Sequence, residues 1–145
     1  MTVNVLPDTT KPNITALRVR PTKLKRGNAL PKLGVKSGRR ITFTLSEDAA
    51  VTFKFEKRTT GRRVGGKCRR TTAANRRRTR CTRYVASGTL KRNFKTGANS
   101  LRFQGRLSSS KRLALARYRL RATAKDAAGN PQSQRRTAIF RLVKR

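Results

Sequence analysis

Basic side chains are the residues of this 145-residue sequence most able to do chemistry, because residues 57–125 hold 23 lysines and arginines and no acid. The whole chain has a formal net charge of +34. So dense a positive field attracts anionic macromolecules and opposes compaction through self-repulsion. The sequence therefore predicts a polyanionic partner without specifying which one.

The cations are densest between Lys57 and Arg83, where twelve of them fall within 27 residues. Arginine supplies 26 of the 39 basic residues, and its guanidinium can form two parallel hydrogen bonds with a carboxylate, phosphate or sulfate group. We interpret this segment as the contact surface for an anionic polymer; the alternative is a solvated loop whose charge only confers solubility. The candidate polyanion-binding residues are Arg62, Arg63, Lys67, Arg69, Arg70, Arg76, Arg77, Arg78, Arg80 and Arg83.

The only two cysteines, Cys68 and Cys81, lie inside this basic segment. A zinc site needs four ligands, and a chain with two cysteines and no histidine cannot supply them. We therefore expect a disulfide, which would close a ring of about 14 residues and favour an oxidising compartment; two free thiols are the alternative. The glycines Gly61, Gly65 and Gly66 do not indicate a phosphate-binding loop, because the G-x-x-x-x-G-K-S/T pattern is missing.

Catalysis is not expected from this composition. The chain has no histidine and only five carboxylate side chains, so a nucleophile with its base, or a paired acid and base, cannot be assembled. We expect no cofactor, no metal ion and no small-molecule substrate, with calcium at clustered acids as a weaker alternative. No apolar stretch is long enough to span a membrane, and no secretory signal is visible at the N-terminus.

Alternation of apolar and polar residues, as in Ile41, Phe43 and Leu45, predicts strands with one buried face. No segment of ten residues shows a helical apolar stripe. We expect an all-β fold, a seven-stranded antiparallel immunoglobulin-like sandwich with one long disulfide-stapled loop, preceded by a linker at residues 1–12. The sandwich would occupy residues 13–145, with strands at Ile14 to Arg20, Arg40 to Ser46, Ala50 to Arg58, Arg83 to Leu90, Ser100 to Gly105, Leu115 to Lys125 and Thr137 to Val143.

Several segments resemble a known family of domains. The linker PDTTKPNIT and the strand YRLRATAK, which is followed by the turn DAAGN, are similar to bacterial immunoglobulin-like and fibronectin type III-like domains of exported surface proteins. LSEDAAVTF, GRRVGGKC and ARYRLRATAKDAAGN resemble the Arg-rich version found in actinobacterial exported proteins. The resemblance runs from Asp8 onward and implies a sandwich fold with an extracellular, non-catalytic role, although a fold does not by itself define a function.

The DAAGN segment has a structural interpretation of its own. Asp126 can accept backbone N–H groups in a local turn, Gly129 can take a positive φ, and Asn130 tolerates left-handed geometry before Pro131. We therefore expect these residues to shape a turn.

Loops of an antiparallel sandwich alternate between its two ends, so the expected strand order separates the charges. One pole would carry acids, together with the cations Lys91, Arg92 and Lys95 as an exception; the other would carry the stapled loop and further cations. Arg117, Arg119 and Arg121 alternate along one strand and would either extend the basic surface or form an ordinary solvent face. The expected acidic pole contains Asp8, Glu47, Asp48 and Asp126, and the basic pole adds Lys23, Lys25, Arg26, Lys32, Lys36, Lys111, Arg112, Lys144 and Arg145.

These observations favour a non-catalytic extracellular module for adhesion or assembly that binds anionic polymers, namely acidic polysaccharide, teichoic acid or DNA, through its basic loop pole. One alternative is a nucleic-acid-binding protein that contacts the backbone without reading sequence. Another is a fibre or virion surface subunit that assembles head to tail, with the acidic pole of one copy on the basic pole of the next.

Overall fold

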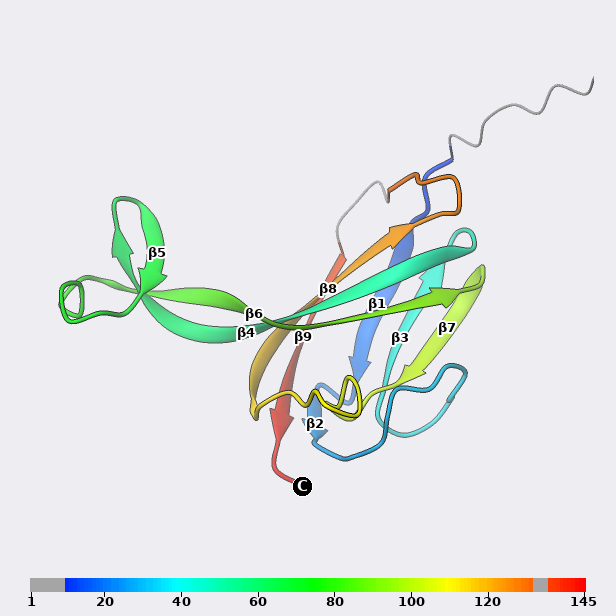
Figure 1. Ribbon diagram of the computed structural model, residues 1–145, viewed down its shortest axis with the longest axis horizontal. Helices are drawn as coiled ribbons and strands as arrows, with labels where there is room; N and C mark the ends of the chain where they lie inside the picture. The colour runs from blue at the N-terminus through cyan, green and yellow to red at the C-terminus, as the bar shows by residue number, and fades with distance from the viewer. Residues whose placement is uncertain (1–9, 132–135) are drawn as a thin grey trace, which may run out of the picture.

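A computed structural model describes residues 10–131 and 136–145, and in these residues the chain is all-β, as the alternation predicted. Two sheets pack face to face (Figure 1). Nine strands make up the two sheets: β1 (Ile14–Arg20), β2 (Lys23–Lys25), β3 (Arg40–Leu45), β4 (Ala49–Val64), β5 (Lys67–Arg70), β6 (Arg80–Phe94), β7 (Gly97–Arg102), β8 (Ala116–Lys125) and β9 (Arg136–Val143).

The smaller sheet has the order β1-β3-β7, and the larger has the order β2-β9-β8-β4-β5, with β6 also paired to β4. All neighbours are antiparallel except β2 and β9, which run parallel. Strand β4 is the centre of the larger sheet: β8 flanks it from Ala50 to Lys57, and β6 flanks its other edge along most of its length.

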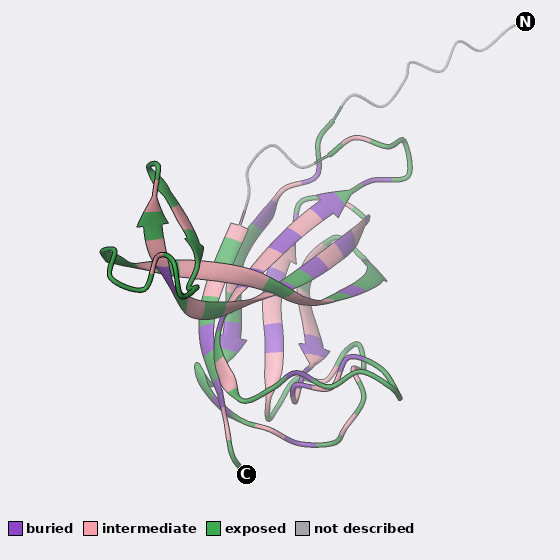
Figure 2. Cartoon of the chain, turned by 60° about the vertical axis from the view of Figure 1, so that its left-hand side comes forward, coloured by how far each residue is buried: buried purple, intermediate pink, exposed green. Residues whose placement is uncertain are grey.

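The core lies between the sheets and consists mainly of the apolar positions of the alternating segments. Phe43 of β3 meets Phe53 of β4 with ring centroids 5.7 Å apart, and Phe55 stacks on Phe103 at 5.0 Å. Phe140 of β9 closes this aromatic cluster, 5.5 Å from the Phe103 ring. The two packed sheets without residues 59–83 are called the body below. Burial alternates with exposure along its strands, as the purple bands of Figure 2 show. This burial is the main source of stability, because the apolar area removed from water drives folding.

The expected number of seven strands is wrong. Strand β2, which buries only Leu24, is too short to give a period-two pattern. The strand expected at Ser100 to Gly105 is instead β7, Gly97–Arg102, because its ladder with β3 runs from Gly97 opposite Leu45 to Arg102 opposite Arg40.

The long loop expected between the third and fourth strands is also wrong. Strands β4 and β6 stay paired as far as Arg62 opposite Arg80, and β5 folds back on the other edge of β4. Gly65 and Gly66 both have positive φ, 58° and 77°, and form the two-residue turn between Val64 and Lys67. Such turns need two residues that tolerate positive φ, which explains the Gly-Gly pair.

Two of the acids predicted to share one pole are close together. The carboxylate of Asp48 accepts hydrogen bonds from the backbone N–H of Thr96 (2.8 Å) and lies 3.6 Å from the Lys95 ammonium group. A hollow of about 310 Å³ is lined by both Asp48 and Asp126, and Lys95 of the β6–β7 turn lines it too, whereas Lys91 and Arg92 lie within β6. Asp8 lies outside the described residues.

The DAAGN segment forms the expected turn. The Asp126 carboxylate accepts hydrogen bonds from the backbone N–H (2.8 Å) and the side-chain Nδ2 (3.1 Å) of Asn130. The positive φ, 86°, falls on Gly129, whereas Asn130 does not adopt left-handed geometry. The role expected for Asn130 is therefore corrected: its amide holds the Asp126 carboxylate instead of supplying a left-handed residue.

Candidate polyanion-binding site

The ten candidate basic residues all lie on residues 59–83, which we call the arm. Beyond Lys57, which pairs with Tyr118, strand β4 no longer has β8 as a neighbour, and the paired strands leave the body. Figure 1 shows the arm projecting sideways from the two sheets, well away from the loops at their lower end. The predicted placement of this segment within a basic pole is therefore wrong, because continued pairing of β4 with β6 directs it outward.

The predicted disulfide is present and joins β5 to β6 across the arm. Cys68 and Cys81 are bonded, with Cα atoms 5.9 Å apart. Gly61 of β4 lies opposite Cys81 and beneath the bridge: a Cβ added there would come within 2.8 Å of the Cys68 Sγ and 2.5 Å of the Arg69 carbonyl oxygen. Only glycine lets the two outer strands close over the central strand at this point.

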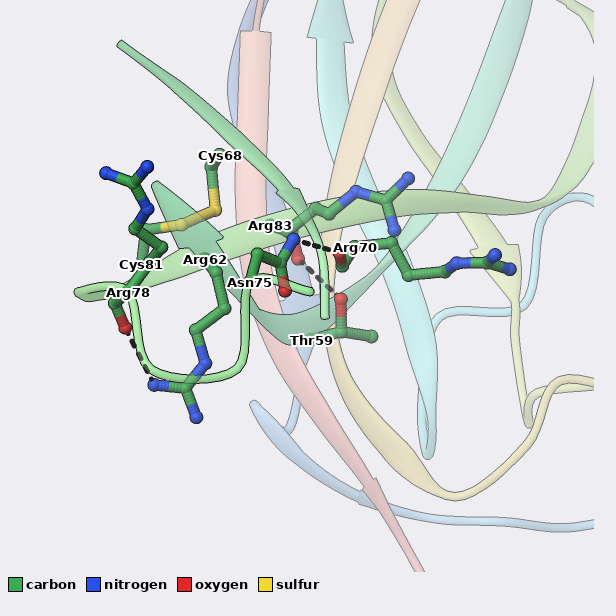
Figure 3. The surroundings of a disulfide bond; sticks show 8 residues. All are labelled: Thr59, Arg62, Cys68, Arg70, Asn75, Arg78, Cys81 and Arg83. Carbon is green, nitrogen blue, oxygen red and sulfur yellow. Dashed lines mark hydrogen bonds between the residues drawn. A yellow bond between two sulfur atoms is a disulfide. The ribbon is translucent and has the colours of Figure 1, made fainter. Parts of the chain in front are cut away.

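The segment between β5 and β6 is anchored by Asn75. Its Oδ1 accepts a hydrogen bond from the backbone N–H of Thr72 (2.8 Å), and its Nδ2 donates to the Arg70 carbonyl (3.0 Å). The backbone N–H of Arg78 donates to the Asn75 carbonyl (2.8 Å), and the Arg62 guanidinium donates to the Arg78 carbonyl (3.0 Å). Figure 3 shows the Asn75–Arg70 and Arg62–Arg78 hydrogen bonds beside the disulfide. Together they hold the basic segment against β4 and β5.

A hollow of about 560 Å³ opens beside the disulfide. Four arginines line it, and the side chains of Arg70 and Arg83 extend on the same side of the arm in Figure 3. The Thr72 and Asn75 side chains add polar groups to the wall. The four arginines are Arg69, Arg70, Arg78 and Arg83.

The structure thus brings together four of the ten predicted residues. Arg62 does not line the hollow; its guanidinium supports the wall through the Arg78 carbonyl. The other five are exposed elsewhere on the arm, where they add charge without sharing this hollow. They are Arg63, Lys67, Arg76, Arg77 and Arg80.

The arm itself contains no acid, because none occurs from residue 57 to residue 125, and no salt bridge among the described residues includes an arm residue. Glu56, just before the arm, is occupied by Arg119 (3.1 Å) and Arg121 (3.6 Å) on the body. Guanidinium groups without counter-charges attract anions and can bind them through paired N–H donors. The chemistry open to this hollow is therefore the binding of carboxylate, sulfate or phosphate groups.

No protein-family model matches the sequence, and no curated protein is significantly similar to it. In the described part of the chain there is no helix long and apolar enough to cross a membrane. The Cys68–Cys81 bridge is the kind of bond that forms and persists in oxidising, extracellular compartments.

One signal in the sequence does indicate that the arm is built from strands. The pair Gly65–Gly66 stands between two basic, strand-compatible segments, RRV and KCR, and a Gly-Gly dipeptide in this setting indicates a two-residue hairpin turn. Read in this way, the sequence predicts strands where a loop was expected. The position of Gly61 beneath the disulfide has no such local signal, because it depends on the pairing of three strands.

Proposed function

We propose that this protein is a non-catalytic extracellular module that binds anionic polymers through its arm. The observation that carries the proposal is the hollow beside the disulfide, which four arginines line in a segment without acids. A polymer with repeated negative charges would engage the hollow and the remaining arm cations together. Each guanidinium contributes a charge-assisted hydrogen bond, and release of bound counterions strengthens the association at low salt.

We further propose that the body is an immunoglobulin-like sandwich. Its strand order supports this: β1, β3 and β7 correspond to the first, second and fifth strands of that fold, and β4, β8 and β9 to the third, sixth and seventh. Strand β6 pairs with β4, as in variants whose fourth strand joins the second sheet. The Tyr118 hydroxyl donates to the Ala114 carbonyl (2.5 Å), which matches the tyrosine corner at the start of the sixth strand.

Titration of charge-matched variants tests the proposal. Replacing all four arginines of the hollow, Arg69→Gln, Arg70→Gln, Arg78→Gln and Arg83→Gln, should weaken binding of a sulfated polysaccharide by tenfold or more, or about 1.4 kcal/mol, at moderate salt. The control removes four exposed cations outside the arm and should cost less than about threefold. Its substitutions are Lys32→Gln, Lys36→Gln, Lys91→Gln and Arg92→Gln.

Equal losses in the two variants would show that only the net charge matters, and the arm would no longer be a site. The same titration with duplex DNA addresses the nucleic-acid alternative. If DNA binds much more tightly than the polysaccharide and the arm variant removes that preference, the protein belongs to the class of sequence-nonspecific nucleic-acid-binding proteins.

A further inference from the structure

Four cations form a row across the outer face of the larger sheet, apart from the arm. Lys23 of β2 pairs with Arg141 of β9, and Arg141 pairs with Arg117 of β8. The β4–β8 ladder ends at Lys57 opposite Tyr118, and the next residue of β4, Arg58, lines the same hollow as Arg117, Arg141 and Lys23. We call Lys23, Arg141, Arg117 and Arg58 the outer row.

The outer row faces solvent and ends on an aromatic ring. All four of its side chains are exposed, because their neighbours Leu24, Tyr118 and Leu142 point into the core. Tyr84 of β6 pairs with Arg58 and continues the row by one strand. Strands in a sheet are about 4.8 Å apart, so the five residues span about 19 Å across the sheet.

Lys23, Arg141 and Arg117 oppose one another directly, and such like-charge pairs destabilise a sheet when nothing compensates for them. The nearest carboxylate, Glu56, lies one row further along the face and is bound by Arg119 and Arg121. No salt bridge of residues 10–131 and 136–145 includes a member of the outer row. Within the described part of the chain no carboxylate offsets this repulsion, so bound ions or an anionic ligand would relieve it.

The row lines a hollow of about 360 Å³ that also has apolar walls. Ile139 of β9 lines this hollow among the cations, and 68% of its surface is exposed to solvent. The Tyr84 ring lines it too and is held from one side by the Arg119 guanidinium, which lies 3.8 Å from the ring centroid. Arg119 is held in turn by its salt bridge to Glu56, so the orientation of the Tyr84 ring is fixed from that side.

From this arrangement we infer that the outer row is a second binding site, and that its ligand is a single chain of an acidic polysaccharide lying across the strands. Carboxylate or sulfate groups on successive sugar rings meet the guanidinium groups, and the C–H faces of the rings cover Ile139 and the free side of Tyr84. A duplex nucleic acid would touch the face with phosphates and leave Ile139 exposed. The inference rests on the proposed function only in taking the partner to be an anionic polymer.

The test uses a galacturonate oligosaccharide as the probe, with duplex DNA and inorganic polyphosphate for comparison. The row variant Arg58→Gln, Arg117→Gln, Arg141→Gln should bind the oligosaccharide at least about tenfold more weakly, whereas the control Lys32→Gln, Lys91→Gln, Arg92→Gln should lose less than about threefold. Unchanged binding by the row variant would overturn the inference, whatever the arm variant does.

A second substitution separates the sugar from the phosphate polymers. Ile139→Thr keeps every charge, so it should weaken oligosaccharide binding by about threefold at high salt and leave DNA and polyphosphate binding unchanged. The polysaccharide assignment is wrong if Ile139→Thr leaves oligosaccharide binding unchanged, or if it weakens DNA and polyphosphate binding as much as oligosaccharide binding.

Stability supplies a readout that a purely structural row would not give. Because the row variant removes direct like-charge pairs, its Tm at low salt should rise by about 1–3 °C, and the rise should shrink as salt is added. If these arginines instead stabilised the fold through packing, the Tm of the row variant would fall at every salt concentration. That result would contradict a ligand-binding role for the outer row. If the arm variant binds as well as the parent protein while the row variant loses binding, the proposed arm site is rejected and this inference stands.

Discussion

The body and the arm share two strands, β4 and β6, but different forces hold them. In the body these strands bury Phe53, Phe55 and Leu90 in the core. Along residues 59–83 only Gly61 is buried, and the arm in Figure 2 is almost free of purple. The arm depends instead on backbone pairing, the disulfide and the contacts of Asn75. A segment this rich in arginine cannot form an apolar core, so a covalent bond takes over part of that role.

The comparison also explains how the chain tolerates its charge. The core needs only one face of each strand, which leaves the opposite face free for arginine at alternate positions, as at Arg117, Arg119 and Arg121. The arm has no inner face to protect, so cations can occupy both of its faces. Charge therefore increases where the demand for burial is least.

The largest effect should follow from damage to the body. Phe55→Ala removes the ring that stacks on Phe103 and meets Phe140 edge-on at 6.2 Å. We expect a loss of about 3–5 kcal/mol in the free energy of unfolding, measured by urea denaturation, because a buried aromatic leaves a cavity. A loss below about 1 kcal/mol would show that the core does not dominate the stability of the body.

The second effect should be confined to the arm. Cys68→Ser combined with Cys81→Ser removes a cross-link worth about 3 kcal/mol in a ring of this size. Amide hydrogens of the arm, such as those of Arg63 and Arg78, should then exchange about a hundredfold faster, while amides of β3 and β8 keep their rates. If the exchange of the β3 and β8 amides accelerates equally, arm and body unfold as one unit and the contrast between them is lost.

A smaller effect is expected at the corner where β8 begins. Tyr118→Phe removes the hydrogen bond to the Ala114 carbonyl and should cost about 1 kcal/mol at neutral pH. Burial raises the pKa of Tyr118 above its ordinary value of 10.0, with the Arg26 charge opposing the rise. Stability linked to this group is therefore fully present below pH 10.0 and is lost as the pH rises through the higher folded pKa.

Unfolding of the Tyr118→Phe variant measured from about pH 9 to about pH 11 checks this linkage. The variant should lose less stability over this interval than the parent protein, because it has no phenol to ionise at this position. Equal losses would mean that Tyr118 does not contribute to alkaline unfolding. The other tyrosine, Tyr84, is present in both proteins and serves as an internal control.

The smallest effect is expected at the acidic end of the body. The hydrogen bond from the Thr96 backbone N–H is the main reason that the pKa of Asp48 lies below 3.8, with the Thr96 hydroxyl and Lys95 adding to it. At pH values above 3.8, Asp48→Asn should therefore lower the Tm slightly. This difference in Tm should vanish as the pH falls through the folded pKa of Asp48. Thermal unfolding at about pH 7 and about pH 2 measures it; a difference that persists in acid would rule out the carboxylate charge as its source.

The sequence predicted the body better than the arm, for a physical reason. Alternation along a strand reports burial of one face, and Ile41, Phe43 and Leu45 are buried as expected. The disulfide was predictable from the two cysteines and the missing histidines. Strand β2 was missed because one buried residue, Leu24, gives no pattern. The arm was misjudged because exposed strands carry no alternation.

The outer row could not be predicted at all. Its members lie at positions 23, 58, 117 and 141, and no local feature links them. Only the register of β2, β9 and β8 sets Lys23, Arg141 and Arg117 side by side, next to Arg58 of β4, and register depends on which residues of distant strands are buried together.

By itself, therefore, the sequence determined an all-β chain, one disulfide and the sign of charge presented to any partner, since composition and strand period are local properties. Tertiary structure alone decided that the basic segment projects as a strand-built arm, and which arginines meet in a hollow or in a row. Those outcomes depend on pairing between residues far apart in the chain, where small shifts in register would change every neighbour.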